Sequence, residues 1–138
     1  LFTFHSSGVE RMVHDLRQLL MQTGHYTDFR EAQFDVADAV DIVIQLKLDR
    51  STGHRYVYKI SEVIANSEDM SFRINDLFVY DRESGRYRVN RKGPSPALIR
   101  SCLEYEMTTS DVEFLASLFR IGDGDRDKYY YADESGEG

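Results

Sequence analysis

The sequence predicts an α+β fold in which helices pack against two antiparallel β-hairpins. Apolar residues recur every three or four positions near both ends of the chain, which is the spacing of amphipathic helices. Between these ends, over residues 40–90, apolar residues alternate with polar ones, which is typical of half-buried strands. With 138 residues, 41% of them hydrophobic, the chain is long enough to bury one core.

The composition argues against several classes of protein. The 24 acidic and 17 basic residues give a net charge of −7, which disfavours binding to nucleic acid or anionic lipid unless the charge is strongly segregated. Cys102 is the only cysteine, so an intrachain disulfide and a multi-cysteine zinc site are ruled out. No apolar run approaches the roughly 20 residues of a membrane-spanning helix.

The first 24 residues predict the end of a strand followed by a helix. Residues 1–5 are mostly apolar, and a chain that starts inside a strand is expected to be part of a larger protein. Residues 6–8, Ser-Ser-Gly, predict a turn and a helix N-cap, and Gly24 is placed to end the helix. The apolar stripe of this helix comprises Val9, Met12, Val13, Leu16 and Leu20.

A second helix is expected over residues 28–40, and the pattern then changes to that of strands. Residues 40–48 alternate between apolar and polar, with Val43 as the exception. The turn at 49–54 joins them to a second strand at 56–64, so the two predict a hairpin. The apolar face of the helix comprises Phe29, Ala32, Val36, Ala37 and Val40; the apolar row of the first strand comprises Val40, Ile42, Ile44, Leu46 and Leu48.

A second hairpin is predicted from strands at 71–80 and 87–90, which flank a turn that contains Gly85. Two short helices follow. Ser95 is placed to cap the first of them, with Pro96 at its first position. A capping box predicts the start of the second. It consists of Ser110 and Glu113, and the apolar face behind it comprises Val112, Leu115, Ala116 and Phe119.

No motif for holding a nucleotide phosphate is present. No glycine heads a G-x-x-x-x-G-K-[ST] run and no G-x-G-x-x-G precedes a helix. Among the histidines, His14, His25 and His54 are interpreted as surface imidazoles. His5 ends the predicted buried strand, where ligands bind in open α/β sheets, so a ligand-binding role and a backbone-bonded structural role both stay open.

Three further features, the acidic tail, Cys102 and a basic cluster, could each have a functional or a merely structural role. The acidic tail places Asp and Glu at several positions of a calcium-binding loop but Lys128 at the position that needs glycine, so it is interpreted as a solvated tail. Cys102 is interpreted as a buried structural thiol. A basic cluster around the second hairpin is interpreted as a partner surface or a solvated edge. The tail residues are Asp123, Asp125, Asp127 and Glu134; the basic cluster is Arg82, Arg86, Arg88, Arg91 and Lys92, with Tyr80 and Tyr87 between them.

A series of segments, in the right order, resembles the ATPases of type II and type IV secretion systems, above all those that assemble tight-adherence (Flp-type) pili. Residues 38–46, Asp-Ala-Val-Asp-Ile-Val-Ile-Gln-Leu, resemble their "AVD, apolar, apolar, QL" strand. Residues 60–64 resemble an "I-T-E-V" strand, with Ser61 in place of threonine, and residues 74–78 resemble an "L-x-D-L-F" element. Residues 3–7, Thr-Phe-His-Ser-Ser, resemble the end of the histidine box of that family. The turn Gly85-Arg86, the linker 93–96 and a closing helix pair that ends in Leu118-Phe119 follow in the same order.

The resemblance implies that residues 1–120 are the C-terminal portion of an α/β, RecA-like motor domain, and that residues 121–138 are a flexible acidic tail. It implies a cytoplasmic ATPase at the inner face of the plasma membrane, usually a hexameric ring, that uses ATP and Mg and acts with membrane platform proteins. His5 matches the histidine that lies near the γ-phosphate. Because the phosphate-binding loop is absent, this chain alone is expected to be inactive and to bind no cofactor. No metal site is expected, and the net charge of −7 argues against a nucleic-acid partner.

Two alternatives to the motor remain at this point. The first is a non-catalytic interaction or oligomerisation module that kept the fold but lost the hydrolytic site. The second is an unrelated small α+β binding domain that uses the acidic, calcium-like tail as its ligand site.

Overall fold

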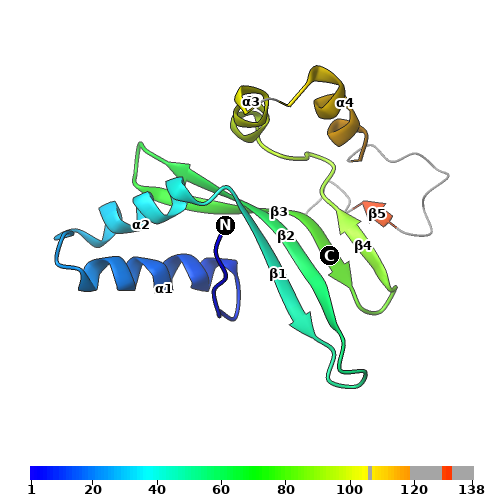
Figure 1. Cartoon of the computed structure of the whole chain (residues 1–138), viewed down its shortest axis with the longest axis horizontal. Coiled ribbons are helices and arrows are strands. Elements are labelled where there is room, and N and C mark those ends of the chain that lie inside the picture. The colour runs from blue at the N-terminus through cyan, green and yellow to red at the C-terminus, as the bar shows by residue number, and fades with distance from the viewer. Residues whose placement is uncertain (106, 119–128, 132–138) are drawn as a thin grey trace. The chain divides into compact units, whose positions relative to one another are not determined.

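The structure is a computed structural model and describes residues 1–105, 107–118 and 129–131. It confirms the α+β class: helices accompany a sheet whose first four strands are antiparallel (Figure 1). The sheet order is β1-β2-β3-β4-β5. The chain divides into two compact units, Leu1–Asn75 and Asp76–Gly138, and the boundary falls within β3. The predicted boundary at residues 120 and 121 lies outside the described residues.

In the first unit, two helices form as predicted. Helix α1 spans Val9–Gln22, and Gly24 follows its C-cap with a φ of +76°, a left-handed conformation that glycine adopts without strain. Helix α2 spans Phe29–Ala39. It starts after Asp28, whose side chain accepts a hydrogen bond from the backbone N–H of Arg30 at 2.8 Å and so satisfies a free donor of the first turn.

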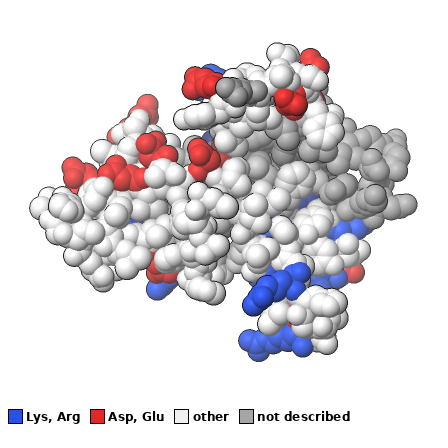
Figure 2. Space-filling model, in the orientation of Figure 1, with Lys and Arg blue, Asp and Glu red and all other residues white. Residues whose placement is uncertain are grey.

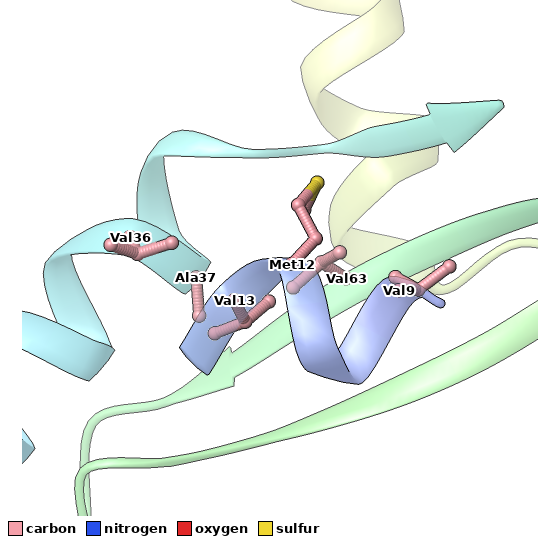
Figure 3. Close-up of a cluster of buried hydrophobic side chains, with 6 residues drawn as sticks. All are labelled: Val9, Met12, Val13, Val36, Ala37 and Val63. Carbon is pink, nitrogen blue, oxygen red and sulfur yellow. The ribbon is translucent and has the colours of Figure 1, made fainter. Parts of the chain in front are cut away.

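The core of the first unit is small and lies between α1, α2 and β2. Figure 3 shows its side chains, with Ala37 of α2 next to Val13 of α1, and Val13 is fully buried. The cluster comprises Val9, Met12, Val13, Val36, Ala37 and Val63. Leu16, Leu20 and Val43 pack against it as partly buried residues, so the predicted stripe of α1 is confirmed.

The first hairpin forms from β1, Ile42–Leu48, and β2, Arg55–Asn66. The strands pair antiparallel, with Ile42 opposite Glu62 and Leu48 opposite Arg55. A register shift after Gln45 gives β2 one extra residue at that point, as in a β-bulge. Both predicted strands are therefore confirmed, and β2 is slightly longer than predicted.

The second hairpin forms from β3, Ser71–Asp81, and β4, Arg86–Val89, with Gly85 at a φ of +68° in the turn. Helix α3 spans Pro96–Glu104. The hydroxyl of Ser95 accepts a hydrogen bond from the backbone N–H of Leu98 at 3.2 Å, which confirms the predicted cap. Helix α4 spans Thr109–Leu118, and a short strand β5, Tyr129–Tyr131, pairs parallel with β4.

In the N-terminal segment the predicted strand is wrong, whereas the predicted N-cap lies within residues 6–8 but uses no hydroxyl. Residues 1–5 form no strand, because no described strand lies beside them to share backbone hydrogen bonds. The N-cap of α1 is Gly8, which makes no side-chain capping bond, and the hydroxyl of Ser6 donates to the Gly8 carbonyl at 3.2 Å instead. Phe2 and Phe4 stay exposed, at 56% and 36%.

Two further predictions fail, one for a capping box and one for an apolar side chain. The capping box of α4 is formed by Thr108 and Asp111, two residues before the predicted one: the Asp111 carboxylate accepts from the Thr108 N–H at 2.9 Å, and the Asp111 N–H donates to the Thr108 hydroxyl at 3.2 Å. Phe29 is 54% exposed rather than buried. Its ring is flanked by the guanidinium groups of Arg17 and Arg30, 5.6 and 5.9 Å from its centroid.

Candidate interaction surface

Strand β1 has an outer edge whose backbone groups are directed away from β2. The Val63 N–H donates to the Asp41 carbonyl at 3.0 Å, and the Asp49 N–H donates to the His54 carbonyl at 2.8 Å. Residues that bond to the neighbouring strand alternate along an antiparallel ladder, so the odd-numbered residues of β1 bond to β2. The even-numbered residues therefore direct their N–H and C=O groups outward. Among the described residues, no strand pairs with this edge.

The same even-numbered residues carry an exposed apolar row. Successive side chains of a strand point to opposite faces, so all four share one face of the sheet. They are Ile42, Ile44, Leu46 and Leu48, with exposed fractions of 38%, 58%, 57% and 53%. We call these four residues the β1 row. An apolar row on an unpaired edge strand is a ready template for pairing with another chain.

The opposite face of β1 is partly covered. Val43 packs against the core cluster, which explains why an apolar residue interrupts the polar positions. The Gln45 side chain donates to the Ser7 carbonyl at 3.3 Å, and the Lys47 ammonium lies 3.4 Å from the centroid of the Tyr58 ring. On this side of β1, Val43 and Gln45 are therefore partly buried while Asp41 and Lys47 are exposed, and the whole β1 row is open.

The exposed surface formed by the β1 row does not extend onto the neighbouring strand β2. Glu62 lies opposite Ile42 on β2 and shares its face, yet Glu62 is only 3% exposed. The Asn75 amide donates to its carboxylate at 3.0 Å, a partner that a buried carboxylate requires. The candidate surface therefore consists of β1 itself rather than the whole sheet face.

Charge is segregated along the first hairpin. In Figure 2 acidic side chains gather over α2, the helix that leads into β1, and basic side chains gather at the turn end of the hairpin. The acidic group includes Glu31, Asp35, Asp38 and Asp41; the basic group includes Lys47, Arg50 and Arg55. The start of β1 is therefore negative and its end positive, although the whole chain is acidic.

The structure places the histidines in three different settings. His5 is exposed in the segment before α1 and does not end a strand, so its phosphate-sensing role stays a prediction. His25 and His54 are exposed, as predicted. His14 is not a surface residue: it is half-buried, its ring meets the Phe72 ring edge-on at 5.7 Å, and its Nδ1 is buried without a hydrogen-bond partner among the described residues. Phe72 on β3 is far from His14 in the sequence, so the residues around His14 gave no indication of this contact.

The remaining sequence candidates that the structure describes do not gather into a metal site. The rings of Tyr80 and Tyr87 contact each other at 5.2 Å within the basic cluster of the second hairpin. Cys102 is half-exposed rather than buried, because α3 has no buried residue. No group of three metal-binding side chains exists among the described residues. The acidic tail residues at 123–127 and 134 lie outside that part of the chain.

Comparisons with protein-family models, curated proteins and solved structures found no match to this chain. In the part of the chain that the structure describes, no helix has the length and apolarity needed to cross a bilayer. Sequence reasoning missed the β1 row as a surface, although it found the alternation. The sequence does contain one indication of which face packs on the core: Val43 is the one apolar residue on the polar side of the strand, and it contacts the core cluster.

Proposed function

We propose that this chain is the C-terminal portion of a ring-forming ATPase that powers pilus assembly or type II/IV secretion. In this proposal the rest of the motor supplies the site that binds ATP and Mg, and the hairpins and helices described here form a further part of its RecA-like domain. The motor is cytoplasmic and peripheral to the inner face of the plasma membrane, where it acts with platform proteins. His5 senses the γ-phosphate from the segment before α1.

The proposal is supported by the order in which the resembling segments fall on the elements. Residues 38–46 lead from α2 into β1, residues 60–64 lie in β2, and residues 74–78 lie in β3. The histidine-box residues 3–7 come immediately before the long helix α1. The linker 93–96 precedes a closing helix pair. Each segment that resembles a strand of the family lies in or leads into a strand.

An ATPase assay tests the proposal. The 138-residue chain has no phosphate-binding loop, so we expect turnover only in a longer polypeptide that supplies one. There, His5→Ala should reduce kcat at least about ten-fold, because a group beside the transferred phosphoryl stabilises its transition state. The matched control is His25→Ala, which also removes an exposed imidazole next to a turn. Equal turnover of the two variants removes His5 from the site, and a longer polypeptide without ATPase activity rejects the motor.

A non-catalytic interaction module is the second candidate, and the β1 row favours it. A protein that keeps four exposed apolar side chains on an unpaired strand edge has a surface suited to a protein partner. This candidate predicts partner binding without any ATP turnover in the natural full-length protein. The ATPase assay described above therefore separates the two candidates.

A further inference from the structure

We infer that the outer edge of β1 binds a second copy of this chain, as an antiparallel β1–β1 pair related by a twofold axis. The inference goes beyond the proposed motor and does not depend on nucleotide chemistry. It rests on the backbone pattern of β1, on the self-complementarity of its side chains, and on the charge gradient along the first hairpin. All of these lie within the first unit.

The backbone pattern limits the ways in which two copies can pair. Only even-numbered residues of β1 present free N–H and C=O groups at the outer edge, so an antiparallel pair must place even positions opposite even positions. Three registers meet this condition and also align at least five residues of β1. They are centred on Ile44, on Gln45 and on Leu46.

Electrostatics select the register centred on Ile44. It places Ile44 opposite the partner's Ile44 and Ile42 opposite the partner's Leu46, so that apolar residues meet across the axis. On the other face, Asp41 lies opposite the partner's Lys47, and the twofold axis repeats this pair. The register centred on Gln45 instead places Asp41 opposite the partner's Asp49, and like charges directly opposite each other are destabilising. The register centred on Leu46 places Lys47 opposite the partner's Gln45 and so forms no pair of opposite charges.

The charge gradient favours the same partner. In an antiparallel pair, the acidic end of each copy at α2 lies alongside the basic turn end of the other (Figure 2). Both Asp41 and Lys47 are exposed and therefore accessible to a partner. A strand with one sign of charge along its whole length would instead repel its own copy. The β1–β1 pair joins two hairpins into one continuous sheet and covers part of each β1 row.

Sedimentation equilibrium on the full 138-residue chain tests the inference. We expect a reversible monomer–dimer equilibrium. Asp41→Lys and Lys47→Asp should each weaken the dimer about ten-fold, because each turns two attractive cross-strand pairs into repulsive ones. The double variant restores opposite charges at both pairs and should recover most of the lost affinity. This rescue separates pairing from damage to the fold, since the double variant contains both substitutions.

A crosslinking experiment tests the register itself. In a Cys102→Ser background, Ile44→Cys should form a disulfide-linked dimer under mild oxidation, because the two positions face each other at the distance of paired strands. Leu48→Cys is the matched control: it is equally exposed but lies far from its own copy. Three results overturn the inference. They are a chain that stays monomeric, a double charge variant no better than the single ones, and binding to anionic vesicles by a monomer.

Discussion

The two faces of β1 differ in a way that its sequence pattern alone does not show. On one face, Val43 packs against the core cluster of α1, α2 and β2. On the other, the β1 row exposes residues that are larger and more apolar than Val43. The helix cluster covers the single apolar residue of one face and leaves the four apolar residues of the other face open. The comparison teaches that an apolar row on an edge strand can indicate either a surface that binds a partner or a side that is buried in the core.

Truncating one side chain of the buried core cluster and one of the exposed β1 row should give the largest difference in the free energy of unfolding. Met12→Ala removes a side chain that is 6% exposed, and we expect a loss of about 2–4 kcal/mol in the free energy of unfolding. Ile44→Ala removes a side chain that is 58% exposed and should change the stability of the monomer by less than about 0.5 kcal/mol. Urea denaturation at low protein concentration measures both. Similar losses at the two positions would mean that the β1 row is covered within the monomer.

The claim that the exposed surface ends at β1, because Glu62 on β2 is buried, can be tested by mutation. Asn75→Ala removes a donor to this buried carboxylate and should cost about 1–2 kcal/mol, because a charged group out of water loses a hydrogen bond. The matched control is Asn66→Ala, which removes a hydrogen bond to the Glu68 N–H in an exposed turn and should cost less. If Asn66→Ala costs as much as Asn75→Ala in urea denaturation, Glu62 is solvated and the open region extends onto β2.

Local chemistry sufficed to predict the elements, whereas contacts between distant segments did not follow from it. Gly24 and Ser95 end and begin helices through bonds to residues within one turn, so their roles were visible in the sequence. The burial of His14 depends on Phe72, 58 positions away, and the choice of the Val43 face depends on where α1 and α2 pack. Residues 1–5 have the composition of a strand but lack a neighbour.

The candidate site was predictable to a similar extent. The alternation over residues 40–48 was identified, and with it the row of four apolar side chains. Alternation gives the identity of the two faces but not which face is covered, because burial is a property of the packed chain. The role of His5 depends on a nucleotide site that this sequence does not contain, so it stays a prediction.

On the covered face, His14 is the residue whose replacement should raise stability. Its Nδ1 is buried without a hydrogen-bond partner in the described part of the chain, and its ring already lies edge-on against Phe72. His14→Phe keeps the aromatic contact and removes the unsatisfied nitrogen, so we expect a gain of up to about 1 kcal/mol. His25→Phe, at an exposed position, should change stability by less than about 0.5 kcal/mol. A clear loss of stability in His14→Phe would show that the nitrogen is solvated.

The smallest expected effect belongs to a turn that lies on neither face. Hydrogen bonds from the side chain and the backbone N–H of Ser71 lower the pKa of Asp69, because they favour the charged carboxylate. A lowered pKa in the folded state means that the carboxylate stabilises the turn above the ordinary aspartate pKa of about 3.9, and that this contribution is lost as the pH falls through the folded-state pKa. A carboxyl-carbon NMR titration should therefore give Asp69 a midpoint below that ordinary value. Ser71→Ala should move the midpoint back toward it. The difference in the free energy of unfolding between the wild type and Asp69→Asn should become smaller as the pH falls, since both side chains are then uncharged. A difference that stays constant with pH would show that the bond to Ser71 does not distinguish the charged carboxylate from the neutral amide.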